Sequence, residues 1–94
     1  MEERETLNQL EALAERLGIT VRHEALKGEA SAHAGVFCRI HGKDVLFLNK
    51  KARETEKRFL LQEALKRYDL SKIYILPSLR TLLDLPGDAS TDSL

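Results

Sequence analysis

The residues in this chain that are capable of specific chemistry include one cysteine and three histidines. Cys38 and His41 have the Cys-x-x-His spacing that occurs in many zinc sites. We expect both residues to lie in one strand, where side chains three positions apart point to opposite faces. His33 stands alone, and no second Cys-x-x-Cys or His-x-x-x-His pair supplies the remaining ligands. The sequence therefore predicts no metal site and no cofactor.

Nucleophilic catalysis at Cys38 would require a neighbouring base and an accessible, electropositive setting. The hairpin that we expect places Cys38 on an apolar face opposite Phe47, which predicts a buried and inert thiol. The same pairing sets His41 opposite Asp44, a cross-strand polar pair worth a few tenths of a kcal/mol up to about 1 kcal/mol. No serine or cysteine is placed to use that pair, so we predict no catalytic residue.

Basic residues are concentrated between positions 50 and 80, although the chain as a whole is neutral. This segment has a balance of +5, whereas residues 1–17 and 81–94 each have a balance of −3. Such segregation is able to steer a partner or to pair with itself in an oligomer. The candidate basic surface consists of Lys50, Lys51, Arg53, Arg58, Lys66 and Arg67. Helical geometry puts Arg58 and Lys66 on one flank and Arg67 on the other, so no single stripe forms. No helix-turn-helix or glycine-rich phosphate loop accompanies these residues, which argues against nucleic acid as a partner.

The size and composition indicate one folded domain. The chain has 94 residues, of which 43% are hydrophobic and 32% are charged. We place the domain at residues 1–85 and expect a disordered polar tail over residues 86–94. The acidic N-terminus lacks the apolar region of a signal peptide, and no apolar run approaches the ~20 residues of a membrane helix. Together with the single cysteine, these features predict a cytoplasmic protein with no membrane partner.

The spacing of apolar residues predicts an α+β fold with a three-stranded, mainly antiparallel sheet. In chain order we expect an N-terminal helix (about residues 3–17), a strand (19–24), a hairpin (36–41 and 44–49), a central helix (54–69), a short strand (73–76) and a C-terminal helix that starts at Pro77. Gly18 suits the end of the first helix, because glycine adopts the left-handed conformation freely. Gly42-Lys43 suits a type II′ turn, and this turn fixes the register of the hairpin.

That register gives the hairpin one apolar face and one mixed face. The apolar face, which we expect to belong to the core, carries Val36, Cys38, Ile40, Val45 and Phe47. Three large apolar residues lie on the mixed face, and Phe59 lies away from the buried stripe of the central helix. Because exposed apolar patches commonly mark interfaces, the candidate interface consists of Phe37, Leu46, Leu48 and Phe59. The alternative left open is that the first and last helices cover both faces.

Some segments resemble known bacterial proteins. Over residues 7–85 the chain is similar to small bacterial proteins of unassigned function, a resemblance carried by Leu17-Gly18-Ile19-Thr20-Val21, Cys38-Arg39-Ile40, Asp69-Leu70 and Pro77-Ser78-Leu79-Arg80. The hairpin and the following helix also resemble ImmA/IrrE-type metallopeptidases, in which a strand pair precedes a His-Glu-x-x-His helix that binds zinc. Glu63 and Arg67 stand where the two histidines belong, or Gln62 and Lys66 do if the alignment slides by one residue. The resemblance therefore implies neither a zinc site nor inherited peptidase activity.

These inferences favour a non-catalytic protein-interaction or self-associating module, which would form a homodimer or bind another protein. Two alternatives stay open: an enzyme whose site is completed only in a complex, and a weak nucleic-acid binder that uses the basic segment 50–72. A convergent polar pocket would favour the enzyme. Binding that depends steeply on salt would favour the nucleic-acid binder.

Overall fold

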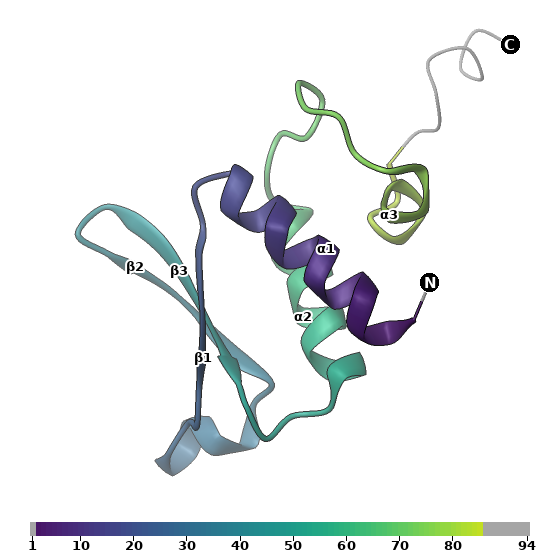
Figure 1. The fold of residues 1–94 in the computed structure, drawn as a ribbon. Coiled ribbons are helices and arrows are strands. Elements are labelled where there is room, and N and C mark those ends of the chain that lie inside the picture. Colours follow the sequence, from purple (N-terminus) through teal and green to yellow (C-terminus); the bar gives the residue numbers. More distant parts are fainter. Residues whose placement is uncertain (1, 86–94) are drawn as a thin grey trace, which may run out of the picture.

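The computed structural model describes residues 2–85, and the predicted tail (86–94) lies outside them. In chain order the elements are α1 (Glu3–Arg16), β1 (Thr20–Glu24), the 3-10 helix η1 (Gly28–Ala32), β2 (Gly35–Ile40), β3 (Lys43–Asn49), α2 (Glu54–Leu65) and α3 (Pro77–Leu82). They build an α+β fold in which α1, α2 and α3 lie on one side of the sheet, with α3 outermost (Figure 1). Within the described range no helix is long and apolar enough to cross a membrane.

The two longer helices form the first layer over the sheet. Leu7, Leu10 and Leu13 recur at helical spacing in α1 and are all buried. Helix α2 contributes Leu61 and Leu65, which have no exposed surface. Helix α1 ends at Arg16, and the chain then turns through Gly18 with φ at 89°. The predicted glycine terminus of this helix is therefore confirmed.

The sheet is mixed, which corrects the prediction of a mainly antiparallel sheet. Its strand order is β1-β3-β2, with β2 antiparallel and β1 parallel to the central strand β3. The predicted short strand at residues 73–76 is also wrong, because these residues form a loop. Ile75 in this loop is 2% exposed and belongs to the core formed by the helices. The central helix ends at Leu65, earlier than expected.

The hairpin turns one residue earlier than predicted. His41 and Gly42 have φ values of 51° and 78°, and a positive φ at both central positions defines a type I′ turn. This turn type matches the right-handed twist of the strands better than the unprimed turns do. As a result Asp44 lies opposite Arg39 rather than His41, and Cys38 lies opposite Val45 rather than Phe47. Each residue nevertheless keeps the face on which it was placed, since every pairing moves by an even number of residues.

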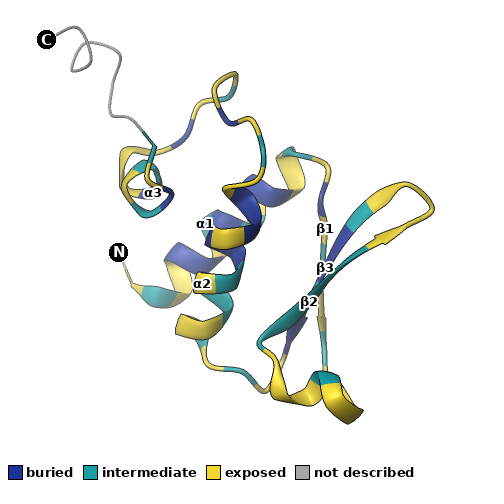
Figure 2. Cartoon of the chain, turned by 180° about the vertical axis from the view of Figure 1, so that it is seen from behind, coloured by how far each residue is buried: buried dark blue, intermediate teal, exposed yellow. Residues whose placement is uncertain are grey.

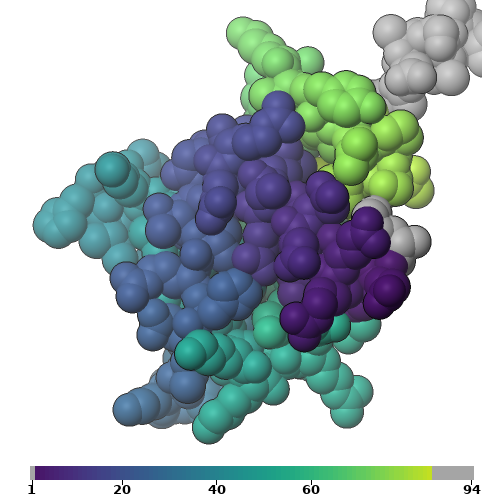
Figure 3. Space-filling model, viewed as in Figure 1, coloured from purple at the N-terminus to yellow at the C-terminus, as the bar shows by residue number. Residues whose placement is uncertain are grey.

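The buried face of the sheet is the one that we predicted to be mixed. Leu46 and Leu48 have no exposed surface, and Phe37 packs against the same core. The side chains of Leu46 and Leu48 are therefore not exposed, which corrects their place in the candidate interface, while Phe37 is half-buried. The polar residues of this face, Arg39 and Asp44, lie at the hairpin end, which projects past the helices (Figures 2 and 3). The helices thus cover only the apolar half of the face.

Candidate protein-interaction surface

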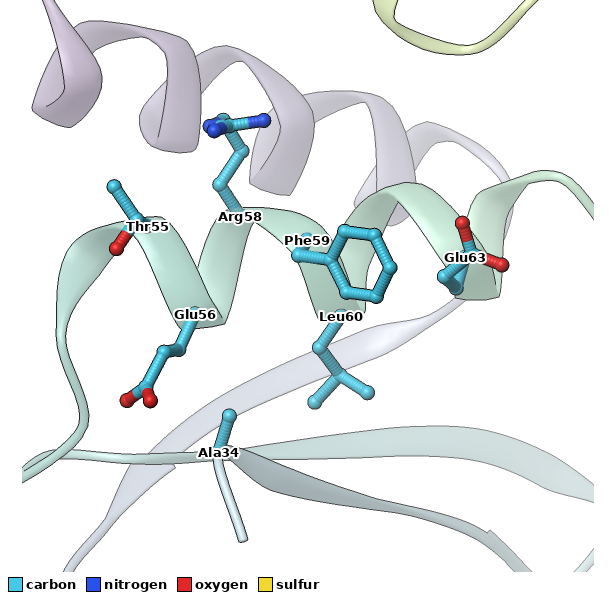
Figure 4. Close-up of a pocket in the computed structure, with 7 residues that line it drawn as sticks. All are labelled: Ala34, Thr55, Glu56, Arg58, Phe59, Leu60 and Glu63. Carbon is cyan, nitrogen blue, oxygen red and sulfur yellow. The ribbon is translucent and has the colours of Figure 1, made fainter.

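Phe59 is the one predicted interface residue that is exposed, with 61% of its surface accessible. It lies on α2 in a groove of about 490 Å³ between this helix and the start of β2. The groove is lined by Ala34, Thr55, Glu56, Arg58, Phe59, Leu60 and Glu63 (Figure 4). Successive helical residues are rotated by about 100°. Arg58 therefore turns toward α1 and Leu60 toward the sheet, while Phe59 stays outside the core (Figure 4).

The floor of this groove depends on Gly35, the first residue of β2. A Cβ atom at this position would lie 2.5 Å from Cδ2 of Leu60 and 2.4 Å from the carbonyl oxygen of Phe47. Both distances are shorter than van der Waals contact, so only glycine lets Leu60 approach the sheet this closely. Gly35 thus sets the spacing between α2 and the strand edge.

A polar network on the other side of α2 holds the helix in place. The Arg58 guanidinium donates hydrogen bonds to the Glu3 carboxylate and to Oε1 of Gln62. Nε2 of Gln62 donates to the Leu82 carbonyl at 3.0 Å, which ties α3 to α2. Gln62 is only 7% exposed, and buried amides are expected to be fully hydrogen-bonded. Arg58 and Gln62 therefore serve the packing of the three helices.

The structure does not bring the six predicted basic residues together. Lys50, Lys51 and Arg53 are exposed around the connection from β3 to α2. Arg58 is bound to Glu3 as described above, and Lys66 lies 2.9 Å from Asp84 and 3.3 Å from Glu63. The bond to Asp84 is the main cause that raises the pKa of Lys66. Arg67 is exposed beyond the end of α2. No continuous basic stripe results within residues 2–85.

Strand β2 is an open edge of the sheet, because it pairs only with β3 in the described part of the chain. In a two-residue hairpin the pair next to the turn, Ile40 and Lys43, is hydrogen-bonded. Alternate residues of β2 must then point their N–H and C=O groups away from β3. These outward-pointing residues are Gly35, Phe37 and Arg39. Sequence reasoning missed this edge because it did not give the strand order.

The face of the sheet that bears no helix is apolar as well. It carries Val36, Cys38, Ile40, Val45 and Phe47, which we predicted to be core. Ile40 is 43% exposed, and Cys38 is a half-buried free thiol. The guanidinium carbon of Arg22 lies 5.9 Å from the centre of the Phe47 ring, a cation–π distance. The prediction of an inert core cysteine is therefore corrected to a partly accessible one.

Two further contacts of titratable side chains connect separate elements of the fold. The hydroxyl of Tyr68 donates a hydrogen bond to the Asp44 carboxylate, which connects the turn after α2 to the hairpin. Burial, reinforced by this bond, raises the pKa of Tyr68 to about 12. Nε2 of His23 lies 2.9 Å from the Glu11 carboxylate. No cluster of three or more His, Cys, Asp or Glu residues able to hold a metal ion occurs in residues 2–85.

No protein-family model, curated protein or solved structure matches this chain. The resemblances to small bacterial proteins and to ImmA/IrrE-type metallopeptidases accordingly stay predictions. At the helix positions compared with the zinc ligands, Gln62 is buried in the network of Arg58, whereas Glu63 and Lys66 form an exposed ion pair.

Proposed function

We propose that this chain is a non-catalytic protein-interaction module that docks its partner at the edge of β2. The observation that carries the proposal is the position of Phe59, 61% exposed, in the groove that adjoins the start of this edge. Partners that add a strand to an open sheet edge gain affinity from main-chain hydrogen bonds and specificity from adjoining pockets. The edge of β2 has free main-chain groups, and the groove around Phe59 adjoins it.

The two parts of this surface contribute in different ways. Gly35, Phe37 and Arg39 present N–H and C=O groups to a new strand. Phe59 is the apolar anchor, since a phenylalanine of which 61% is exposed has roughly 120 Å² left to bury. Covering that area would contribute about 3 kcal/mol. Aromatic anchors of this kind supply much of the energy at interfaces.

The polar groups near the surface favour docking over catalysis. Arg58 is held by Glu3 and Gln62, and Glu63 is paired with Lys66. The Glu56 carboxylate accepts a hydrogen bond from the backbone N–H of Arg53. A catalytic site would need convergent, activated groups in the groove, whereas these side chains support the helix that displays Phe59.

Site-specific photocrosslinking in the source cells tests this proposal. A benzophenone amino acid replaces Phe59 in one variant and Tyr74 in the control variant. Tyr74 is 70% exposed and lies beside α1, whose Arg16 donates a hydrogen bond to the Tyr74 carbonyl at 3.1 Å. We expect a protein adduct from position 59 and none from position 74. No adduct at 59, or identical adducts at both positions, would contradict the proposed function.

A further inference from the structure

We propose that the partner is a second copy of this chain, joined by antiparallel pairing of the two β2 edges into one six-stranded sheet. This inference rests on the docking surface proposed above and adds the identity of its occupant. The two-fold axis passes beside Phe37, so that Phe37 pairs with the partner's Phe37. Gly35 then pairs with the partner's Arg39.

This register uses every outward-pointing group of the edge. Gly35, Phe37 and Arg39 point their N–H and C=O groups outward, and antiparallel hydrogen-bonded pairs form between such residues. Centring the axis on Phe37 matches all three residues with counterparts in the second copy. Shifting the register by two residues in either direction leaves Gly35 or Arg39 of each copy without a counterpart in the edge.

The composition of the two edge strands points to β2 as the strand that is covered. Proteins commonly protect free edges with charged residues or proline. β1 carries Arg22, His23 and Glu24 among its five residues. β2 has Arg39 as the one charged residue among its six and contains no proline. Pairing β2 with its own copy covers this unprotected edge, and two-fold symmetry closes the assembly after two chains.

Charge complementarity supports a second copy in particular. The Arg39 side chain is 72% exposed and lies 3.8 Å from Asp44, a loose contact. Opposite the partner's Gly35, this guanidinium would lie beside the groove in which Glu56 and Glu63 are both exposed. Each copy therefore offers its Arg39 to Glu56 and Glu63 of the other, in addition to the Lys66 that already pairs with Glu63, and two-fold symmetry forms both contacts at once.

The first experiment measures the molar mass of the full chain by light scattering and sedimentation over a range of concentrations. We expect a dimer that Arg39→Pro dissociates, because proline removes an outward N–H while the ladder to β3 stays intact. Two hydrogen bonds are lost per dimer, so the dissociation constant should rise on the order of 100-fold. Arg39→Lys, which keeps the charge and the N–H, is the matched control and should stay dimeric. Circular dichroism checks that both variants fold.

The second experiment traps the register with a disulfide. In the proposed pairing residue 36 lies opposite the partner's Cys38, with Cα atoms about 4.5 Å apart, which suits a disulfide. Val36→Cys should therefore cross-link to a dimer under mild oxidation. Within one chain, positions 36 and 38 are about 7 Å apart along the strand and cannot be bridged. The control is Cys38→Ser with Thr20→Cys, which moves the thiol to β1 on the same face and should stay uncross-linked.

The outcomes separate this inference from the proposed function. The homodimer is overturned if the chain is monomeric at all concentrations and the Val36→Cys variant does not cross-link. If position 59 still gives an adduct in cells, the docking surface stands and its occupant is a different protein. If position 59 gives none, both proposals are wrong. A dimer that survives Arg39→Pro, or that cross-links through Thr20→Cys, also overturns pairing at β2.

Discussion

Replacing Gly35 with alanine should destabilise the protein because the added methyl group has no space. The new Cβ would lie 2.4 Å from the Phe47 carbonyl oxygen and 2.5 Å from Cδ2 of Leu60. Leu60 is a side chain that is able to rotate away, but the carbonyl belongs to the central strand. Relief of the first contact therefore requires the backbone of β2 or β3 to move. The same movement would separate α2 from β2 and distort the groove around Phe59.

The expected magnitude follows from two opposing effects. Inserting a methyl group into a packed site costs about 1–3 kcal/mol. Alanine restricts the unfolded chain more than glycine, which returns about 0.4–1 kcal/mol where the backbone conformation is compatible. The net loss in the free energy of unfolding should be about 1–2 kcal/mol. For a domain of this size, that loss lowers Tm by roughly 5–15 °C.

Urea and thermal unfolding of four proteins measure this effect: the wild type, Gly35→Ala, Leu60→Ala and the double variant. Truncating Leu60 removes one of the two clashes and leaves the contact with the Phe47 carbonyl, so Gly35→Ala should cost about 0.5–1 kcal/mol less in the Leu60→Ala background. Additivity within about 0.5 kcal/mol would show that Leu60 does not press on Gly35. A Gly35→Ala protein as stable as the wild type would refute both close contacts at Gly35, the one with the Phe47 carbonyl and the one with Leu60.

Three further predictions each concern a single residue. His41→Gly should raise the free energy of unfolding by about 1 kcal/mol, since His41 has φ at 51° in a type I′ turn; unchanged urea unfolding would contradict this turn. Asn49→Ala should lower the free energy of unfolding by about 1–3 kcal/mol, because the Asn49 side chain is 3% exposed and its amide nitrogen donates hydrogen bonds to the carbonyls of Ser31 and His33. Calorimetry measures this loss, and an unchanged stability would exclude this role of Asn49. The pKa of Tyr68, raised to about 12 from 10.0, gives stability that is present below pH 10 and lost as pH rises toward 12. Unfolding from pH 8 to 11.5 should show a smaller decline for Tyr68→Phe than for the wild type, and equal declines would remove this cause.

The sequence predicts the strands of the hairpin well but not the face that the helices cover. Side-chain alternation assigned each hairpin residue to the correct face, although the turn lies at His41-Gly42 and not at the predicted Gly42-Lys43. Counting apolar residues then favoured the face of Val36 and Phe47 as the core. The helices cover the opposite face because its polar residues are confined to the projecting hairpin end. Alternation carries no information about which part of a face a helix reaches.

Non-local pairing explains the other differences. β1 pairs in parallel with β3, although β2 lies between them in the sequence, and nothing in the local pattern of β1 specifies that partner. Residues 73–76 have the composition of a strand, yet they bury Ile75 against the helices from a loop. Short apolar runs fit both structures equally well. The exposure of Phe59 was predictable because helical geometry alone decides it.

Two ion pairs account for part of the charge segregation along the chain. The acidic first helix supplies Glu3 to Arg58 of the basic segment, and Asp84, near the acidic C-terminal end, meets Lys66. These two basic side chains are thereby occupied, whereas Lys50, Lys51, Arg53 and Arg67 are exposed without joining into one basic stripe, which weakens the case for a polyanionic partner. Arg39 is also highly exposed, makes only a loose contact with Asp44, and lies on the edge strand β2. The proposed docking surface combines the apolar side chain of Phe59, the main-chain groups of the β2 edge and the exposed Arg39, and this combination suits a protein strand better than a nucleic acid.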